Sequence, residues 1–333
     1  MKVLNIGIVG TGEITKIHFE ILKLIPEVCV KAVFGRNLER LFFKQNEWGV
    51  KGYSSIADMV MKEKLDIVLI ANENFNHAKD ARIALESGAH VLVEKPLDAS
   101  LHFASELVDF SISKKKILGV VLQKRFDSNI LKIKNIIENC ELGEIGLARV
   151  DVFMHRSKDY FNSKKWIKDP KKIGGGILLH HAVHSIDALL WVMNSKVISI
   201  SGWTSNQARS MEIEDCGGCW LRFENGATAS IMASVNLHES LRNRLEIFGN
   251  LSSVYLEGIS LRHQPYFSKS KEKLHNTITI SEGDELKRLW IDFINAVKNN
   301  RPPNASGESA LKTQIIIDSL YRSSESLRTI QFC

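Results

Sequence analysis

The sequence predicts an α/β protein in which a doubly wound parallel sheet at the N-terminus is followed by an α+β domain with an open mixed, mostly antiparallel sheet. Over the first 123 residues, short apolar runs alternate with helical patterns, and a glycine loop follows the first apolar run. The later sequence is rich in strand-like segments. Alternating strands and helices are typical of parallel sheets with crossover helices.

The expected elements of the N-terminal domain follow from these patterns. Buried strands are expected at Leu4–Val9, Val28–Phe34, Ile67–Ala71, His90–Glu94 and Ile117–Leu122. Apolar residues at a spacing of three and four predict helices at Ile14–Ile25, Ile56–Glu63, Ala78–Ser87 and Ser100–Ser113. Gly88 is expected to end one of these helices as a C-cap.

After Gln123 the pattern changes to strands with few helices. Helices are expected at Ser128–Asn139, Leu178–Met193, Glu285–Asn299 and Glu308–Leu327. Strands are expected at Arg149–Phe153, Val197–Thr204, Gly218–Phe223, Ala227–Ser234, Arg244–Phe248 and Ser252–Leu256. Asn225-Gly226 between two of these strands is typical of a hairpin turn.

Length and composition are those of a globular chain with two domains. A chain of 333 residues exceeds the size at which a single core usually stops growing, so we expect domains at 1–123 and 124–333. Apolar residues at 44% and charged residues at 25% are globular values, so most of the chain should fold.

Charge, hydropathy and cysteine usage restrict the partners and the location. The net charge of +6 forms no basic stripe with stacking aromatics, which argues against nucleic-acid binding. No stretch reaches the roughly 20 apolar residues of a membrane span; the best, Ile177 to Met193, includes histidines and Asp187. Five scattered cysteines fit a reducing compartment, so a cytoplasmic protein is expected. Cys216 and Cys219 lack a second pair, so no metal site is expected.

The segment after the first expected strand has the arrangement of a dinucleotide-binding site. Ile6–Val9 is followed by Gly10-Thr11-Gly12-Glu13-Ile14-Thr15, which opens a helix. Gly10 permits a tight turn, and Gly12 lets the backbone approach a pyrophosphate. The helix N-terminus offers unpaired N–H groups to the anion, so we expect NAD or NADP to bind here.

The end of the second expected strand bears on the choice between the two cofactors. Val33-Phe34-Gly35-Arg36-Asn37 lacks the acid that usually bonds the ribose 2'-hydroxyl of NAD. Gly35 leaves room, and Arg36 offers a planar guanidinium suited to a 2'-phosphate. The alternative is that Arg36 stacks on adenine or lies in solvent. NADP is therefore expected in preference to NAD.

Two further segments carry candidate chemistry. Glu94-Lys95-Pro96 ends an expected strand at the carboxyl edge of the sheet, where the Lys95 ammonium could bond a substrate oxygen or instead lie on the surface. In the second segment, Gly174 to Asp187, an α-helix would place His180, His184 and Asp187 on one face. A neutral imidazole there suits proton transfer, with structural or zinc-binding histidines as the alternatives.

These motifs, in this order, resemble those of the Gfo/Idh/MocA family, named for glucose-fructose oxidoreductase and inositol dehydrogenase. The matching segments are Gly10-Thr11-Gly12-Glu13-Ile14 with His18, Ala84 through Leu97, Gln123-Lys124-Arg125-Phe126, Leu142-Gly143-Glu144-Ile145, Gly174 to Asp187, and Phe223-Glu224-Asn225-Gly226-Ala227. The resemblance implies a Rossmann domain, a mixed-sheet domain that packs sheet to sheet in homodimers or homotetramers, and hydride transfer at a secondary alcohol.

The resemblance also implies roles for individual residues. Lys95 and His184 become the catalytic pair, and Asn72, Asn74 and His77 lie near the nicotinamide. Arg125, Trp166, His181 and Asp187 line or brace the substrate pocket. Two positions depart from the family pattern: Asn72-Glu73-Asn74 replaces its T-P-N, and His180 replaces an aspartate that often supports the catalytic histidine. His184, His180 and Lys95 are therefore all candidates for the proton carrier.

The expected site thus has three overlapping sets of residues. The catalytic candidates are Lys95, His184 and His180. The cofactor-binding candidates are Gly10, Thr11, Gly12, Glu13, Ile14, Gly35, Arg36, Asn37, Asn72, Asn74, His77, Glu94 and Lys95. The substrate-binding candidates are Lys95, Arg125, Trp166, His180, His181, His184 and Asp187.

The leading hypothesis is an NAD(P)-dependent dehydrogenase or reductase acting on a sugar, cyclitol, sugar phosphate or nucleotide sugar. Two alternatives are a redox-assisted, NAD-dependent glycosidase that recycles its cofactor and a non-catalytic NADP-binding regulator. Net turnover of added cofactor separates the first two. A regulator would be expected to lack Lys95 or His184, and both are present.

Overall fold

The computed structural model describes residues 2–157, 169–206, 212–258, 260–265 and 284–332. The chain forms two compact units. Unit 1 comprises Met1–Gln123, Lys171–Gly174 and Leu286–Lys312, and unit 2 comprises Lys124–Pro170, Gly175–Glu285 and Thr313–Cys333. The first boundary follows residue 123, and two segments from the later sequence return to unit 1.

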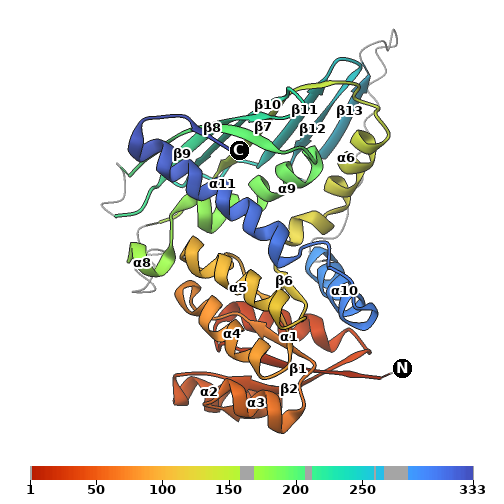
Figure 1. Cartoon of the computed structure of the whole chain (residues 1–333), viewed down its shortest axis with the longest axis vertical. Helices are drawn as coiled ribbons and strands as arrows, with labels where there is room; N and C mark the ends of the chain where they lie inside the picture. Colours follow the sequence, from red (N-terminus) through yellow and green to blue (C-terminus); the bar gives the residue numbers. More distant parts are fainter. Residues whose placement is uncertain (1, 158–168, 207–211, 259, 266–283, 333) are drawn as a thin grey trace. The chain divides into compact units, whose positions relative to one another are not determined.

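Unit 1, which contains β1, β2 and β6 of Figure 1, is built on a six-stranded parallel sheet. Its strand order is β3-β2-β1-β4-β5-β6. Its strands are β1 (Leu4–Val9), β2 (Val28–Phe34), β3 (Lys51–Tyr53), β4 (Ile67–Ile70), β5 (His90–Val93) and β6 (Leu118–Val120). The order reverses between β1 and β4, which is the point where doubly wound sheets bind ligands. The predicted N-terminal fold class is confirmed.

The helices of unit 1 cover both faces of this sheet. They are α1 (Glu13–Lys23), α2 (Leu38–Trp48), α3 (Ile56–Glu63), α4 (His77–Glu86), α5 (Leu101–Ser113) and most of α10 (Asp284–Asn299), and unit 1 also contains most of the short α8 (Pro170–Ile173). The helix α2 and the strand β3 were not predicted from the sequence. In α2, Leu38, Phe42 and Phe43 are more than half exposed, so its apolar residues do not form the single stripe that identifies a helix.

The centre of the sheet is fully buried, as the apolar runs in the sequence require. Ile8, Val68 and Leu69 have no exposed surface, because helices cover both faces of a parallel sheet. The helix α10 joins this core late in the chain: a Cβ atom on Gly119 of β6 would lie only 2.7 Å from the Phe293 ring. This packing explains why residues 286–312 belong to unit 1.

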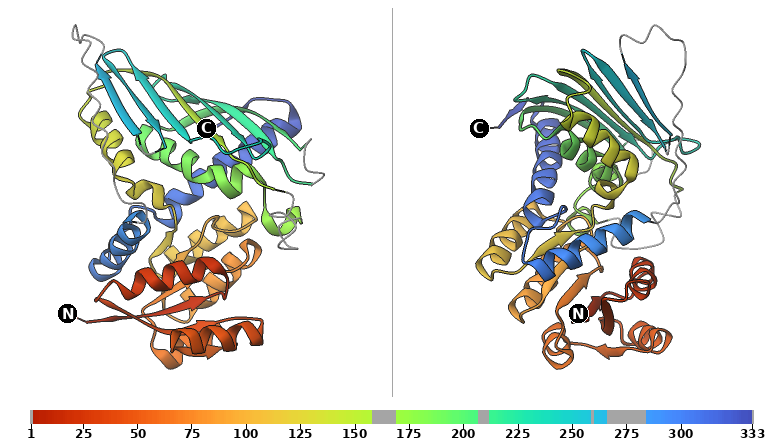
Figure 2. Two further views of the ribbon diagram at one scale, coloured as in Figure 1. Left: turned by 180° about the vertical axis from the view of Figure 1, so that it is seen from behind. Right: turned by 90° about the vertical axis from the view of Figure 1, so that its right-hand side faces the viewer.

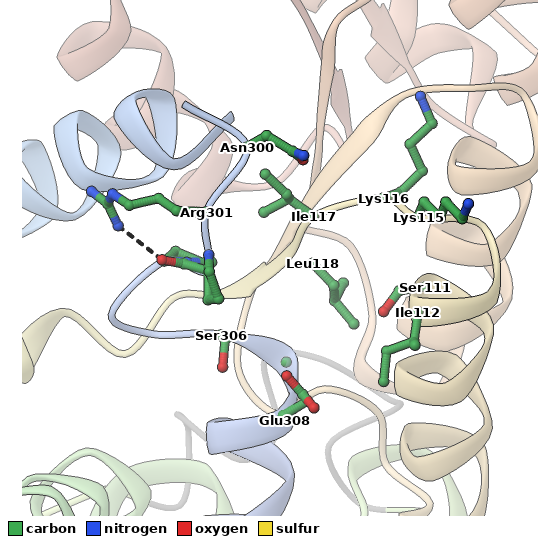
Figure 3. A pocket seen from close by; sticks show the side chains of 13 residues that line it. Ser111, Ile112, Lys115, Lys116, Ile117, Leu118, Asn300, Arg301, Ser306 and Glu308 are labelled. Carbon is green, nitrogen blue, oxygen red and sulfur yellow. Dashed lines mark hydrogen bonds between the residues drawn. The ribbon is translucent and has the colours of Figure 1, made fainter. Parts of the chain in front are cut away.

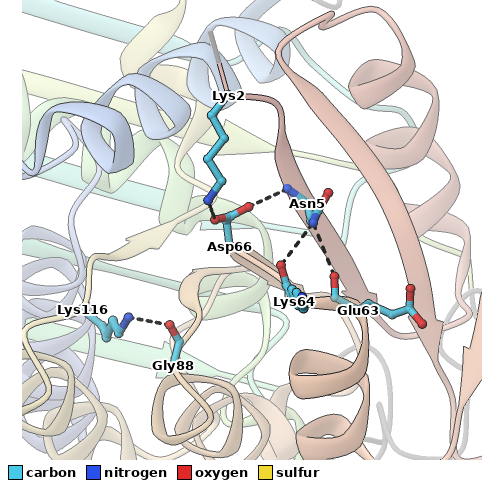
Figure 4. Close-up of polar contacts among 7 residues, drawn as sticks. All are labelled: Lys2, Asn5, Glu63, Lys64, Asp66, Gly88 and Lys116. Carbon is cyan, nitrogen blue, oxygen red and sulfur yellow. Dashed lines mark hydrogen bonds and ion pairs between the residues drawn. The ribbon is translucent and has the colours of Figure 1, made fainter.

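The amino edge of the sheet is closed by polar contacts (Figure 4). The Lys2 ammonium donates to the Asp66 carboxylate at 2.6 Å, and the other oxygen of Asp66 accepts from the Asn5 N–H at 2.8 Å. The Asn5 side chain also donates to the carbonyl oxygens of Glu63 and Lys64. These contacts fix the start of β1 and leave the ligand-binding edge at the other end of the strands.

A surface cavity of about 360 Å³ lies at the amino end of β6 (Figure 3). Lys115, Lys116 and Arg301 give its rim a basic character. Arg301, however, is bonded to Asp292 at 2.7 Å, and Lys116 donates to the Gly88 carbonyl. The expected cofactor residues follow the carboxyl ends of the strands, so this cavity is not part of that site.

His90, the first residue of β5, gives unit 1 a dependence on pH. Its Nδ1 accepts a hydrogen bond of 3.0 Å from the Ile117 N–H, which requires this nitrogen to be unprotonated. Burial, with help from the Lys116 ammonium, lowers the pKa of His90 from 6.5 to about 4. Between these values the unfolded chain binds a proton that the folded chain does not, so stability falls as the pH falls.

The variant His90→Asn keeps an acceptor for the Ile117 N–H but does not titrate. Between about pH 7 and pH 4.5, its free energy of unfolding should therefore fall by about 1 kcal/mol less than that of the wild type. The full shift is discounted because the ring is partly exposed. Urea denaturation at the two pH values measures the effect. The exposed His102 on α5 provides the control variant His102→Asn. Equal pH slopes for wild type and His90→Asn would contradict the assignment.

Unit 2 is built on an eight-stranded mixed sheet with the order β13-β12-β11-β7-β10-β9-β8-β14. Its strands are β7 (Ile145–Phe153), β8 (Val197–Ser205), β9 (Cys216–Phe223), β10 (Thr228–Ser234), β11 (Arg244–Gly249), β12 (Ser252–Glu257), β13 (Ser260–Pro265) and β14 (Ile330–Gln331). Among the described strands, the β7–β10 pair is parallel and the other pairs are antiparallel. The predicted open mixed sheet and the turn at Gly226 are confirmed.

Helices lie against one face of this sheet (Figure 2). They are α6 (Ser128–Glu138), α9 (Val183–Met193) and α11 (Gly307–Ser326). On strands β8, β9 and β10, Trp203, Trp220 and Met232 are 45%, 60% and 43% exposed. The stretch Pro170–Met193 is long and apolar enough by composition to span a membrane, but 72% of its most apolar window is buried within the fold, as in a core helix.

Candidate functional site

The register of the unit 1 sheet brings the expected cofactor residues to one edge. Val9 pairs with both Phe34 and Ile70, and Ile70 pairs with Val93, so four strands end level. The next residues are tied across the same strands: the Gly10 N–H donates to the Phe34 carbonyl, and the Glu94 N–H donates to the Ile70 carbonyl. The segments starting at Gly10, Gly35, Ala71 and Glu94 therefore emerge side by side.

The glycine loop has the geometry that an anion-binding turn requires. Gly10 has φ of +126°, a conformation that side chains rarely allow, and a Cβ there would lie 2.4 Å from the Ala71 carbonyl. Gly12 is the N-cap of α1, and no side chain caps this helix terminus. Thr15, which stands where many such loops have a third glycine, is buried and donates its hydroxyl to the Gly12 carbonyl.

This loop fits the phosphate groups of a dinucleotide. A Cβ atom built on Gly12 would meet no atom of the described residues within 4 Å, so there is space above the uncapped N-terminus of α1. Glu13 and Ile14 begin the helix and are exposed beside that space. Backbone N–H groups and the helix dipole in this position attract a diphosphate.

Arg36, at the end of β2, is held by a buried carboxylate that the sequence analysis did not single out. Its Nη2 contacts both oxygens of Asp80 on α4, at 2.7 and 2.8 Å. The Asn72 side chain donates to the same carboxylate at 2.6 Å. The ion pair with Asp80 was not foreseen in the expectation that Arg36 meets a 2'-phosphate, stacks on adenine or lies in solvent, and the Arg36 side chain remains 44% exposed. The neighbouring Asn37 caps α2 by accepting from the Arg40 N–H.

Asn74 lies in the turn between β4 and α4, His77 is the first residue of α4, and both are buried. The Asn74 side chain donates to the Ile173 carbonyl at 3.0 Å. His77 Nδ1 lies 2.7 Å from the Pro96 carbonyl, an acceptor, so this nitrogen carries the proton. His77 thereby links the start of α4 to the turn that contains Lys95.

Glu94 is fixed by a chain of two hydrogen bonds that begins at Trp290, in a distant part of the sequence. The Trp290 indole N–H donates to Nδ1 of the fully buried His18 at 2.9 Å. Because Nδ1 accepts, the proton of the neutral ring lies on Nε2, which is 2.9 Å from Glu94. The second oxygen of Glu94 accepts from the Lys95 N–H at 3.1 Å.

Lys95 follows Glu94 and precedes a cis peptide bond to Pro96. Burial lowers the pKa of Lys95, and the charge of Glu94 opposes that shift. Burial also raises the pKa of Glu94, but the His18 hydrogen bond and nearby charges, including Lys95, lower it by more. The result is a lysine with a lowered pKa at the carboxyl edge of the sheet, beside an ionised carboxylate.

In unit 2 the histidine segment differs from the single α-helix predicted for it. Leu178–Ala182 forms a π turn, and α9 starts after it at Val183. A π turn inserts an extra residue into a helix and occurs often at functional sites. His180 and His181 lie in this turn with their rings 4.8 Å apart and nearly perpendicular, and His184 lies in the first turn of α9. All three rings are partly buried.

Asp187 and Arg125 form a buried ion pair below these histidines along α9. Arg125 donates from Nε and Nη2 to the two carboxylate oxygens at 2.7 and 2.6 Å, and both side chains are at most 4% exposed. The Thr313 hydroxyl adds a third hydrogen bond of 2.8 Å to Asp187. Lys124, next to Arg125, donates to Ser185 at 3.1 Å. These contacts attach α9 to the start of unit 2.

Glu214 closes the N-terminal end of the histidine segment. Its carboxylate accepts from the N–H groups of Gly176 and Leu178 at 2.7 and 3.0 Å and from the Tyr321 hydroxyl at 2.8 Å. Burial raises its pKa. A Cβ on Gly176 would lie 1.9 Å from the Glu214 carbonyl, which explains a glycine at this position.

The predicted site residues therefore fall into two groups. The cofactor-binding candidates and Lys95 lie together at the carboxyl edge of the unit 1 sheet, and Arg125, His180, His181, His184 and Asp187 lie in unit 2. Trp166 lies outside the described residues. Asp80, Trp290 and Glu214 were missed. Each is defined by a contact with a residue at least 38 positions away, for which the sequence gives no local signal.

The sequence matches two models of one protein family. Residues 4–122 match the oxidoreductase family with an NAD-binding Rossmann fold, and residues 130–255 match the GFO/IDH/MocA C-terminal domain. A relative described as myo-inositol 2-dehydrogenase, from Thermotoga maritima, is 24% identical over 98% of each chain.

Two solved structures have a similar fold. The WlbA dehydrogenase from Bordetella pertussis, in complex with NADH and UDP-GlcNAcA, has a TM-score of 0.91 and 23% identity and covers 100% of this chain and 98% of its own. Levoglucosan dehydrogenase, in complex with NADH and levoglucosan, has a TM-score of 0.91 and 20% identity over 99% of each chain. At these identities the likeness concerns the fold.

Proposed function

Because the chain belongs to the GFO/IDH/MocA oxidoreductase family, we propose that it transfers a hydride between a nicotinamide cofactor and a CH–OH group of a sugar, cyclitol, sugar phosphate or nucleotide sugar. The observation that carries this proposal is Lys95, with its lowered pKa, at the level ends of four parallel strands. Relatives described as acting on inositol or as binding levoglucosan or a nucleotide sugar support a carbohydrate-type substrate.

Lys95 binds the substrate oxygen in this proposal. A bound nicotinamide supplies or accepts the hydride. The Lys95 amine donates a hydrogen bond to the oxygen at which charge develops, and a lowered pKa reduces the cost of exchanging a proton with that oxygen. Glu94, held by His18, keeps a negative charge beside the lysine and orients its backbone.

The histidines are the other candidates for proton transfer. His184 and His180 lie on successive turns of one segment, which Glu214 anchors at its start and the Arg125–Asp187 pair anchors further along. We assign substrate binding to this segment, with Arg125 and Asp187 as positioning residues, and leave the proton carrier among His184, His180 and Lys95. The pH dependence of the three single variants distinguishes them.

We further propose that the site prefers NADP over NAD. The end of β2 presents Arg36 and no acid, and a charge-assisted contact to the 2'-phosphate contributes about 1.5 to 3 kcal/mol. Arg36→Ala should therefore weaken NADPH binding about tenfold to a hundredfold and NADH binding much less. Fluorescence titration of each reduced cofactor measures this, with thermal unfolding as a check because Asp80 loses its cationic partner. Equal losses for both cofactors would remove the basis of the preference.

A substrate panel tests the proposed activity. Cyclitols, free sugars, sugar phosphates and nucleotide sugars would be incubated with each oxidised cofactor, and the absorbance of reduced nicotinamide would be followed. Reduction with at least one carbohydrate class supports the proposal. The proposal would be contradicted if the cofactor were reduced only with alcohols unrelated to carbohydrates. It would also be contradicted if the cofactor bound but no compound of the panel reduced it.

The proposal includes a homodimer or homotetramer formed through the unit 2 sheet, in the cytoplasm. Apolar surface is exposed on strands β8, β9 and β10 at Trp203, Trp220 and Met232, and exposed apolar patches often mark protein–protein interfaces. The cysteines of the described residues are free, as expected in a reducing compartment. Sedimentation velocity of the wild type should give a mass of at least twice the monomer mass. The variant Trp220→Glu should have a lower mass, because the charge disfavours burial of this face. A monomeric wild type would contradict this part.

A further inference from the structure

The contact between Arg36 and Asp80 bears on how strongly the site discriminates between the two cofactors. Arg36 follows β2, Asp80 lies on α4, and Asn72 follows β4, so three separate segments meet at this carboxylate. The Asp80 side chain is 2% exposed, whereas the Arg36 side chain is 44% exposed. One end of the guanidinium is therefore anchored in the interior, and the rest faces solvent.

Asp80 needs Arg36 for electrostatic reasons. A buried carboxylate is costly unless a cation and hydrogen bonds compensate it. Asn72 donates one hydrogen bond but has no charge, so Arg36 is the cation bonded to this carboxylate. If Arg36 turned fully towards a ligand, Asp80 would be left with Asn72 alone. Both hydrogen bonds to Asp80 come from Nη2 of Arg36, so Nη1 and Nε are the donors of the guanidinium that Asp80 does not hold.

We propose that Asp80 is a specificity-determining residue, which limits the affinity of the site for the 2'-phosphate of NADP relative to the 2'-hydroxyl of NAD. The proposal rests on the cofactor assignment made above and concerns the ratio of the two affinities. A 2'-phosphate carries a charge of about −1.5 to −2 at neutral pH, whereas a ribose hydroxyl is neutral. The negative charge of Asp80 offsets the positive charge of Arg36. Of the two groups at the ribose 2' position, it therefore disfavours the phosphate and has little effect on the hydroxyl.

The two ways in which Asp80 acts have the same sign. By holding Nη2 it competes with a phosphate for the guanidinium, and by its charge it repels the same phosphate. Removing the charge while keeping the shape should therefore favour NADPH. Asp80→Asn keeps a carbonyl oxygen that can accept from Arg36, so the position of the guanidinium is partly retained.

The experiment measures dissociation constants of NADPH and NADH by nicotinamide fluorescence, without any substrate. For Asp80→Asn we expect the NADPH-to-NADH affinity ratio to rise about tenfold, equivalent to about 1.4 kcal/mol, mainly through tighter NADPH binding. Asp109→Asn, on the exposed side of α5, changes the net charge of the chain equally and should leave the ratio unchanged. Thermal unfolding confirms that each variant is folded.

A second variant keeps the test decisive if Asp80→Asn does not fold. Arg36→Lys retains the charge but supplies one ammonium, which Asp80 would hold, so its NADPH-to-NADH ratio should fall to that of Arg36→Ala. A ratio for Asp80→Asn that falls or stays within about threefold of wild type, or an Arg36→Lys ratio equal to wild type, would overturn the role of Asp80 alone. A wild type that binds neither cofactor would overturn the cofactor assignment and this inference together.

Discussion

Replacing Lys95 with methionine should lower the turnover number about a thousandfold, or about 4 kcal/mol of barrier, while leaving the affinity for reduced cofactor within about threefold of wild type. Methionine keeps most of the apolar side chain but can neither donate a hydrogen bond to the substrate oxygen nor exchange a proton with it. Single-wavelength kinetics with the best substrate of the panel, together with fluorescence titration of the cofactor, measures the two effects.

Lys79 provides a matched control for this variant, because it is an exposed lysine on α4 in the same unit. Lys79→Met should retain wild-type turnover. In the wild type, alcohol oxidation requires the unprotonated Lys95 amine to accept the hydroxyl proton, so the rate should rise with pH to a midpoint below the 10.5 of an ordinary lysine, and this rise should disappear in the variant. Activity of Lys95→Met within about tenfold of wild type would show that Lys95 is not central.

Replacing Asp187 with asparagine should destabilise unit 2 by about 3 kcal/mol or more. The guanidinium of Arg125 is 4% exposed, and its Nε and Nη2 donate to the Asp187 carboxylate. The variant removes the Asp187 charge from beside a buried cation, and the loss of one partner of a buried pair usually costs more than the removal of both partners. Urea denaturation followed by circular dichroism measures the change in the unfolding transition.

The exposed pair of Asp58 and Lys62 supplies the control, since Asp58→Asn removes a carboxylate from a solvent-exposed ion pair and should cost less than about 1 kcal/mol. The double variant Arg125→Met with Asp187→Leu should recover part of the loss, because it removes both buried charges. A cost of less than about 1 kcal/mol for Asp187→Asn would mean that Arg125 reaches another partner or water in the variant.

Much of the fold followed from periodic apolar patterns. The helix at Ile56–Glu63 and the strands at Leu4–Val9 and Val28–Phe34 have the predicted bounds. Buried parallel strands give continuous apolar runs, and amphipathic helices give apolar residues at a spacing of three and four, so both are recognisable in the sequence. The short β3 and β14 were missed, since strands of three and two residues carry too few positions to show a period. The π turn at Leu178–Ala182 was also missed, because its apolar pattern resembles that of an α-helix.

The sequence indicated candidate site residues only where they are close together along the chain. The glycine loop and the Glu94-Lys95-Pro96 turn stand at strand ends, where the chain itself defines their position. The partners that tune them come from distant segments: Trp290 fixes the tautomer of His18, and Asp80 holds Arg36. Sequence patterns predicted the residues that emerge at the sheet edge, but the charges that surround them depended on tertiary packing.

The most direct test of the proposed function is the stoichiometry of the reaction. Reduced nicotinamide and oxidised carbohydrate would be quantified in the same sample, with the substrate that the panel identifies. We expect one reduced nicotinamide for each carbohydrate oxidised, and neither product from Lys95→Met at comparable times. Carbohydrate turnover without net change in the nicotinamide would instead indicate a glycosidase that recycles its cofactor. Cofactor binding without any turnover would indicate a regulator, and either result would contradict a dehydrogenase.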